Sequence, residues 1–188
     1  MANLFDNFGM NVENCLRFDI DSFKNYFDQS VMFRDGMFML MHQNIRSFNK
    51  NIDKFMLYLN NLSIRPKLIV LSETWFSASN YHDILGYRGY HTFSNERTGG
   101  GVSIFVSQEL MCRELSSLKI NCDFLESCGV TIEVTKTIKI NVLGFYRPPS
   151  GDISEFHTAM SRFLNNVNLR EFLVAMGDSN VNTLVFTF

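Results

Sequence analysis

The sequence predicts an α/β protein in which helices cover mixed β-sheets. Residues 37–73 show a strand–helix–strand pattern. Strands separated by glycines and polar turns follow over residues 86–146. A second amphipathic helix and a further strand come over residues 153–178. Such elements form layers because each helix and each sheet buries an apolar face against another element. With 188 residues, 46% of them hydrophobic, the chain is long enough for one core.

A strand, a helix and a second strand make up the first part. Residues 37–44 (MFMLMHQN) form a continuous apolar run of strand length, which is typical of a strand covered on both faces. Residues 49–62 carry apolar side chains at helical spacing, and Asn49 or Asn51 is available as the helix cap. A proline ends the turn after this helix, and residues 67–73 (KLIVLSE) predict another buried strand.

Strands predominate in the second part. Four of them are expected, at residues 86–93, 98–108, 125–134 and 137–146. The last two are predicted to pair around a short polar turn. Apolar residues at helical spacing predict an amphipathic helix over residues 153–167, and residues 171–178 (EFLVAMGD) predict the final strand.

Composition excludes several classes of protein. The four cysteines are scattered, with no C-x-x-C pair and no histidine at zinc-finger spacing, so neither a structural zinc site nor a disulfide framework is expected. No stretch approaches the roughly 18 to 20 apolar residues of a membrane span, and the N-terminus lacks a signal-peptide pattern. We therefore expect an intracellular protein, in the nucleus or cytoplasm, with no membrane partner. A net charge of -2 argues against binding nucleic acid by electrostatics alone.

The first 36 residues differ from the remainder. They contain short irregular clusters of Asn, Asp and Phe, and their acidic residues outnumber the basic ones. We expect residues 1–36 to form an acidic, weakly structured leader with a domain boundary near Gly36.

Polar side chains lie where the expected strands stop. They are Asn44, Glu73, Tyr146 with Arg147, and Asp178 with Asn180. Strand ends at one edge of a sheet can gather such groups into a single cleft. A carboxylate with a nearby amide can hold Mg²⁺, a second carboxylate can deprotonate a water, and amide, phenol and guanidinium donors can bind a phosphate. This set favours phosphodiester hydrolysis.

Each of these residues also has an ordinary structural interpretation. Taken alone, Glu73 is more often a solvated residue at a strand end, Asn44 a turn former and Tyr146 a core phenol. The glycines of residues 99–101 could cradle a phosphate, but they lack the lysine–serine ending of a P-loop, so a hairpin loop is the favoured interpretation. The four histidines show no ligand spacing.

Seven stretches, in a fixed order, resemble the endonuclease/exonuclease/phosphatase superfamily. They are HQNIRSFNKNIDKF, LIVLSETWFS, GYRGYHTF, RTGGGVSIFV, LESCGVTI, VLGFYRPPS and VAMGDSN. The resemblance covers about residues 37–180 and is closest to the endonuclease domain of non-LTR (LINE-like) retrotransposon polyproteins. It implies a DNase-I-like, four-layer α/β sandwich of two packed mixed sheets with outer helices.

The resemblance also implies roles for single residues. Asn44 matches the first-motif asparagine near the metal and the scissile phosphate, and Glu73 matches the glutamate that binds Mg²⁺, with Mn²⁺ as an alternative. Asn44 and Glu73 are therefore the expected metal ligands. Tyr146 matches the tyrosine placed against the phosphate. Asp178 matches the aspartate that activates the attacking water, and Asn180 matches the asparagine that holds the phosphate.

Two arginines are expected to contact the substrate. Arg147, with the two prolines after it, matches the retrotransposon version of the tyrosine motif, and Arg97 is a candidate DNA contact just before the glycines. The implied activity is Mg²⁺-dependent nicking of DNA. In full-length relatives a reverse transcriptase domain lies on the same chain.

The sequence departs from the family pattern near its end. In residues 177–180 (GDSN) a serine replaces the usual phenylalanine, and residues 181–188 form a divergent tail. The family domain continues with further strands and a closing S-D-H motif. We therefore expect a C-terminally truncated domain, incomplete in its second half, with little or no activity because the closing histidine is missing.

Two alternatives to an active endonuclease stay open. One is a non-catalytic retrotransposon remnant or partial gene product. The other is a phosphoesterase of the same superfamily that acts on lipid or small phosphate esters, which the fold alone does not exclude.

Overall fold

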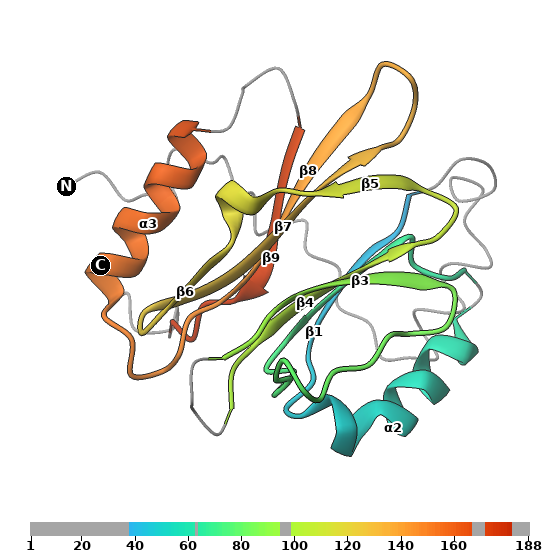
Figure 1. The fold of residues 1–188 in the computed structure, drawn as a ribbon, viewed down its shortest axis with the longest axis horizontal. Helices are drawn as coiled ribbons and strands as arrows, with labels where there is room; N and C mark the ends of the chain where they lie inside the picture. The colour runs from blue at the N-terminus through green and yellow to red at the C-terminus, as the bar shows by residue number, and fades with distance from the viewer. Residues whose placement is uncertain (1–37, 63, 95–98, 167–171, 182–188) are drawn as a thin grey trace, which may run out of the picture. The chain divides into compact units, whose positions relative to one another are not determined.

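A computed structural model describes residues 38–62, 64–94, 99–166 and 172–181. The predicted leader of residues 1–36 and residues 182–188 of the predicted tail lie outside the described residues. The described part contains two β-sheets and two α-helices (Figure 1).

The first sheet has four strands in the order β1-β2-β4-β3. Their bounds are β1 Leu40–Asn44, β2 Leu68–Ser72, β4 Val102–Ser107 and β3 Tyr87–Thr92. Strands β1 and β2 are parallel, with Asn44 opposite Ser72, and the other neighbours are antiparallel. Parallel neighbours need a crossover connection, which the first helix provides.

Helix α2 (Phe48–Asn61) covers the outer face of this sheet (Figure 1). Its buried residues Phe55 and Leu59 belong to one apolar cluster with Ile69 of β2 and Phe105 of β4. The apolar stripe read from the sequence is therefore the face that packs on the sheet.

The start of this helix differs from the prediction. Neither Asn49 nor Asn51 is the cap, because Ser47 occupies the N-cap position, where its side chain makes no capping hydrogen bond. Asn51 Nδ2 donates instead to the carbonyl oxygens of Ile45 and Arg46, at 2.8 Å each. The Asn51 side chain thus ties the helix to the loop that precedes it.

The second sheet has five strands, in the order β5-β7-β8-β9 with β6 paired to β7. Their bounds are β5 Met111–Glu114, β6 Ile120–Cys122, β7 Leu125–Glu133, β8 Lys139–Tyr146 and β9 Phe172–Asp178. Strands β8 and β9 are parallel, with Tyr146 opposite Asp178, and the other pairs are antiparallel. Helix α3 (Ile153–Asn166) connects them and covers the outer face, where Phe156 packs with Leu143.

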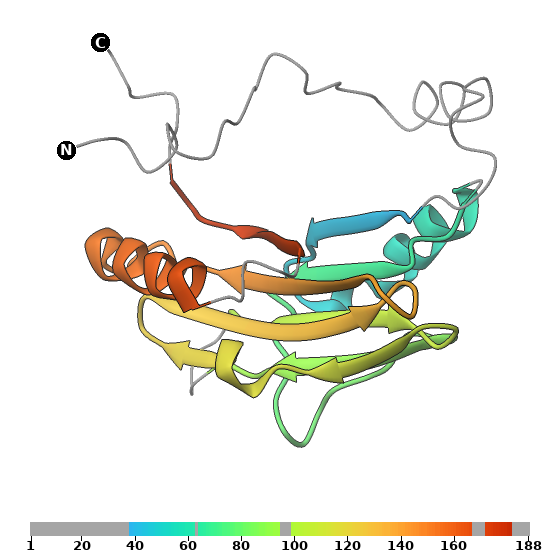
Figure 2. The ribbon, with the colours of Figure 1, turned by 90° about the horizontal axis from the view of Figure 1, so that it is seen from above.

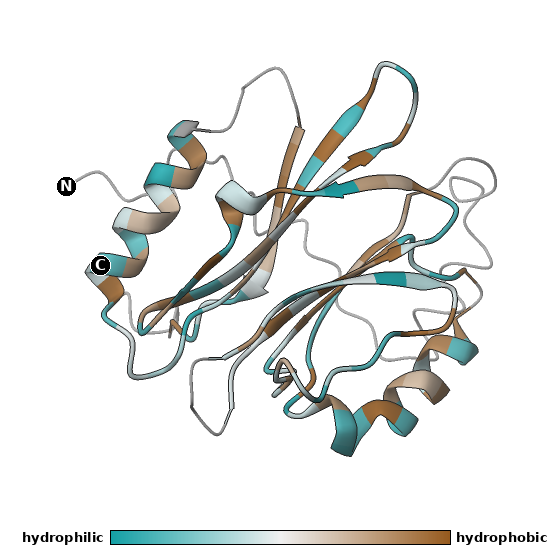
Figure 3. Cartoon of the chain, in the orientation of Figure 1, coloured by the Kyte–Doolittle hydropathy of each residue, from teal (hydrophilic) through white to brown (hydrophobic). Residues whose placement is uncertain are grey.

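The two sheets pack face to face, with one helix outside each (Figures 1 and 2). The cluster between them includes Val70 and Ile104 from the first sheet and Val130 and Val142 from the second. Figure 3 shows hydrophobic residues concentrated on the strands, whereas turns and parts of each helix are hydrophilic. The predicted fold class, two packed mixed sheets with outer helices, is confirmed. Neither described helix is long and apolar enough to cross a lipid bilayer.

Residues 109–122 carry no predicted element, yet they form β5, the 3-10 turn η4 (Ser116–Leu118) and β6. The side chains of β5 and β6 are exposed or half-buried, so no alternating apolar pattern marks them. Their positions come from backbone pairing with β7.

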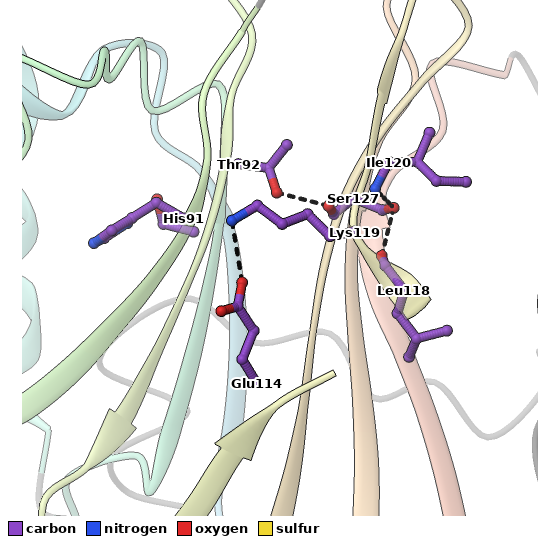
Figure 4. Close-up of polar contacts among 8 residues, drawn as sticks. His91, Thr92, Glu114, Leu118, Lys119, Ile120 and Ser127 are labelled. Carbon is purple, nitrogen blue, oxygen red and sulfur yellow. Dashed lines mark hydrogen bonds and ion pairs between the residues drawn. The ribbon is translucent and has the colours of Figure 1, made fainter. Parts of the chain in front are cut away.

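A buried hydrogen bond joins the two sheets. Thr92 Oγ1 in β3 donates to the carbonyl oxygen of Ser127 in β7 at 2.7 Å (Figure 4). The Ser127 hydroxyl donates to the Leu118 carbonyl oxygen at 2.8 Å and accepts from the Ile120 N–H at 3.2 Å. One network therefore fixes η4 and β6 on β7 and anchors the neighbouring sheet.

Candidate active site

Two parallel strand pairs, one in each sheet, bring polar residues to one site at their carboxyl ends. Asn44 ends β1 and Glu73 follows β2, while Tyr146 and Asp178 end β8 and β9 opposite each other. Asn44 Nδ2 donates to Glu73 Oε1 and to Asp178 Oδ2, at 2.7 Å each. Because Asp178 belongs to the second sheet and Glu73 follows a strand of the first, this one amide joins carboxylates from both sheets.

Left-handed backbone conformations occur at three residues around the site. The φ angles are 54° at Glu73, 58° at Trp75 and 48° at Asn180. Such angles are uncommon outside glycine, and strained residues cluster at functional sites. The Ser47 N–H donates to the Glu73 carbonyl oxygen at 2.8 Å, and the Trp75 N–H donates to the Gly100 carbonyl oxygen at 2.9 Å. These bonds hold the segment after β2 in its conformation.

Tyr146 is buried beside the carboxylates and hydrogen-bonds with Glu73. Burial raises the pKa of the Tyr146 phenol to about 12, and the nearby carboxylates of Glu73, Glu126 and Asp178 act in the same direction. The hydroxyl therefore stays protonated in neutral solution. It can serve as a hydrogen-bond donor.

Arg147 ties the end of β8 to the turn after β9. Its Nε donates to the Ser179 carbonyl oxygen at 2.7 Å and its Nη2 to the Asn180 carbonyl oxygen at 2.9 Å. Asn180 Nδ2 donates back to the Arg147 carbonyl oxygen at 2.7 Å, and the Asn180 N–H donates to Asp178 Oδ1 at 3.0 Å. Arg147 is only 6% exposed, and its guanidinium donates to backbone oxygens in place of water. Its substrate contact stays a prediction, and Arg97 lies outside the described residues.

Glu126 is a buried carboxylate that the sequence analysis did not single out. It is 1% exposed, and it accepts hydrogen bonds from the Ser94 hydroxyl at 2.9 Å and from the Gly101 N–H at 2.5 Å. A Cβ on Gly100, whose φ is 81°, would lie 2.7 Å from the Glu126 carboxylate, so only glycine fits there. Gly100 and Gly101 therefore pack on Glu126 as part of the β3–β4 hairpin. A lone glutamate inside the apolar run LESCGV was the available signal.

His42 also lies near the site, although the spacing of the four histidines predicted no ligand among them. Its Nε2 lies 3.2 Å from Ser72 Oγ. Burial lowers the pKa of His42, and the Asp178 carboxylate acts in the opposite direction. The signal was its spacing, since side chains two residues apart on a strand share a face and Asn44 is two residues on.

The donor set at the site consists of oxygen atoms. Among the residues that the structure describes, no group of three or more His, Cys, Asp or Glu side chains could hold a metal ion. The carboxylates of Glu73 and Asp178 lie together, and Asn44 Oδ1 accepts from the Arg46 N–H at 3.2 Å. A small oxygen set fits Mg²⁺, which proteins hold through one or two carboxylates while it keeps several waters.

No protein-family model and no curated protein matches the sequence. Among solved structures, the endonuclease domain of TRAS1, a telomere-specific non-LTR retrotransposon, matches with a TM-score of 0.55 and 15% identity, over 79% of this chain and 61% of that chain. This chain has the DNase-I-like fold. The 3′ phosphatase NExo from Neisseria, bound to a product DNA hairpin, matches with a TM-score of 0.53 and 15% identity, over 77% of this chain and 58% of that chain. A humanized D. rerio TDP2 matches with a TM-score of 0.53 and 10% identity, over 80% of this chain and 69% of that chain.

The DNase-I-like fold that the family resemblance implies is thus confirmed. The chain spans about three fifths of the length of the TRAS1 and NExo chains that it matches.

Proposed function

We propose that this site hydrolyses phosphodiester bonds of DNA with the help of a divalent cation, Mg²⁺ or alternatively Mn²⁺. The observation that carries the proposal is the Asn44 amide that joins the Glu73 and Asp178 carboxylates beside the Tyr146 hydroxyl. The names of two similar structures support DNA as the substrate class. One is a retrotransposon endonuclease domain, and the other is an enzyme with a product DNA hairpin.

Each polar group has its own task in this proposal. Asp178 orients a water molecule and accepts its proton as the water oxygen attacks phosphorus. The bond from phosphorus to one sugar oxygen breaks, and this leaving oxygen takes a proton from solvent. Tyr146, whose hydroxyl hydrogen-bonds with Glu73, would donate instead to a phosphate oxygen. Asn180 would donate the amide N–H that does not bind the Arg147 carbonyl. Glu73 and the amide oxygen of Asn44 would hold the cation, which would supply charge neutralisation at the phosphate.

We further propose that the chain belongs to an endonuclease of a non-LTR retrotransposon, which acts in the nucleus or cytoplasm. The Tyr-Arg-Pro-Pro sequence of residues 146–149 and the similarity to the TRAS1 domain support this. In this proposal the full-length protein also carries a reverse transcriptase domain.

We expect slow catalysis. Backbone carbonyls engage the guanidinium of Arg147, so this side chain does not neutralise charge on the phosphate. The absence of one group that stabilises charge in the transition state costs about two to three orders of magnitude in rate. We therefore predict that the activity of this chain is impaired.

A comparison of substrates tests the proposed reaction. The purified chain is incubated with supercoiled plasmid, with a small phosphate monoester and with a phosphorylated lipid, each in Mg²⁺, in Mn²⁺ and in EDTA. We expect slow nicking of the plasmid that EDTA abolishes, with the other two substrates unchanged. Hydrolysis of the ester or the lipid without nicking would contradict the proposal and favour the phosphoesterase alternative.

A further inference from the structure

A pocket of about 220 Å³ opens beside Glu73 and Tyr146. The segment after β2 contributes Trp75 to its lining, the segment after β8 contributes Pro148 and Pro149, and β7 contributes Glu126. None of the tasks proposed above uses Trp75 or the two prolines. The pocket is smaller than the roughly 300 to 1,000 Å³ of sites that take drug-sized ligands, so its size suits a single ring system.

Trp75 is held in place at this pocket while much of its side chain faces solvent. It is 48% exposed, and its φ of 58° is fixed by the hydrogen bond from its N–H to the Gly100 carbonyl oxygen. Gly99 lies at the edge of the indole, since a Cβ there would be 3.6 Å from the indole nitrogen. A large exposed aromatic side chain on a strained, hydrogen-bonded backbone is preorganised for stacking against the ring of a ligand.

The chemistry of the lining decides which part of a nucleotide fits the pocket. Flat apolar surfaces of Trp75, Pro148 and Pro149 lie beside serine and tyrosine hydroxyls. A neutral flat ring with polar edges would meet both kinds of surface. The pocket therefore suits a nucleobase.

We propose that this pocket binds one unpaired base of the DNA strand next to the scissile phosphate, stacked on Trp75 and packed against Pro148 and Pro149. The inference rests on the proposed phosphodiesterase function, because the phosphate at Glu73 and Tyr146 places the neighbouring nucleotide at the pocket. A base inside a duplex is stacked on its neighbours and cannot enter. The strand that binds is therefore single-stranded or has one base turned out of the stack.

The single tryptophan of the chain makes the test direct, because its fluorescence reports on this pocket alone. The chain is titrated in Mg²⁺ with a short single-stranded oligonucleotide and with an abasic strand of the same length. Stacking contributes about 1 to 3 kcal/mol per base, so we expect saturable quenching and an affinity about tenfold or more above that of the abasic strand. Equal affinity for the two strands would overturn the inference.

Variants separate stacking from general packing. Anisotropy of a labelled strand should show an affinity near that of the wild type for Trp75→Phe and a loss of about tenfold for Trp75→Ala. Tyr81→Ala is the matched control, since Tyr81 is 49% exposed and does not line the pocket. Unchanged affinity of Trp75→Ala, or an equal loss in Tyr81→Ala, would contradict the inference.

Failure of the inference and failure of the proposed function give different results. Metal-dependent nicking without base-dependent affinity would contradict the proposed base-binding pocket and support the proposed phosphodiesterase reaction. Base-dependent affinity without nicking would support the pocket as a nucleotide site and contradict the proposed reaction.

Discussion

Asn44 is the residue that holds the two carboxylates of the site together, since both hydrogen bonds of its amide nitrogen end on them. Replacing Asn44 with alanine leaves Glu73 and Asp178 facing each other without the amide between them. We expect single-turnover nicking to fall on the order of 100-fold, because a preorganised polar group is lost from the reacting centre. The fold should survive, since Asn44 is half-buried at the end of a strand.

The matched control for this variant is Gln43→Ala. Gln43 carries a similar amide on the same strand but is exposed and lies on the other face of β1. Its nicking rate should equal that of the wild type. A rate for Asn44→Ala that matches the rate for Gln43→Ala would show that the amide bridge has no catalytic role.

His91 links the stability of the protein to pH. Its ring packs against Phe76 and Phe105, its Nδ1 lies 2.8 Å from Ser103 Oγ, and its Nε2 is buried with no hydrogen-bond partner among the described residues. Burial lowers the pKa of His91 from 6.5, although Asp83 acts in the opposite direction. The unfolded chain therefore binds a proton at a higher pH than the folded chain does.

The free energy of unfolding should consequently fall as the pH drops below about 6.5, by at most about 1.4 kcal/mol per pH unit from this residue. His91→Phe keeps the aromatic packing and removes the titrating group, so its stability should change less over this acidic range. Urea unfolding at several pH values between about 5 and 8 measures both slopes. Parallel slopes for the two proteins would refute this role of His91.

The sequence was informative about which polar residues stand at strand ends and less so about what they touch. Asn44, Glu73, Tyr146 and Asp178 could be found because each follows an apolar run. The contacts of Arg147 with the turn after β9 depend on the register of β8 and β9, which no local pattern encodes.

The turn after β9 is built on Arg147. A lysine in its place lacks the planar fork that reaches two carbonyl oxygens at once, so Arg147→Lys should lower the free energy of unfolding by about 1 to 3 kcal/mol. If Arg147 acts by positioning Asp178 and Asn180, the nicking rate falls while DNA affinity stays within about twofold. Rate and affinity come from single-turnover nicking and anisotropy. A fall in affinity with an unchanged rate would identify Arg147 as a substrate contact instead.

Thr92 connects strand β3 to β7 through a single buried hydrogen bond. Thr92→Val is close in shape but leaves the Ser127 carbonyl without this donor, so we expect a loss of about 1 kcal/mol in the free energy of unfolding. Thr92→Ser is the control that keeps the hydroxyl and loses only a methyl group. Denaturant unfolding of both variants distinguishes the two effects, and an equal loss in both would attribute the change to packing.

The architecture as a whole was predictable where burial imposes a pattern. A strand covered on both faces, such as β2, is a continuous apolar run, and both helices carry one apolar face. The edge elements β5, η4 and β6 lack such a signal, since pairing with β7 holds them. Both sheets meet at one site because of their three-dimensional packing, which no local pattern of the sequence encodes. The sequence indicated this packing only through the ordered motifs that resemble a known family.

The measurement that tests the central claim most directly is single-turnover nicking of supercoiled plasmid in Mg²⁺ by the wild type, Glu73→Gln and Glu155→Gln. Glu155 is exposed on α3 and does not line the pocket, so it controls for loss of a carboxylate. We predict slow nicking by the wild type and by Glu155→Gln, a loss on the order of 100-fold in Glu73→Gln, and no nicking in EDTA. A folded wild type that nicks no faster than Glu73→Gln would contradict the account and identify the chain as a non-catalytic remnant.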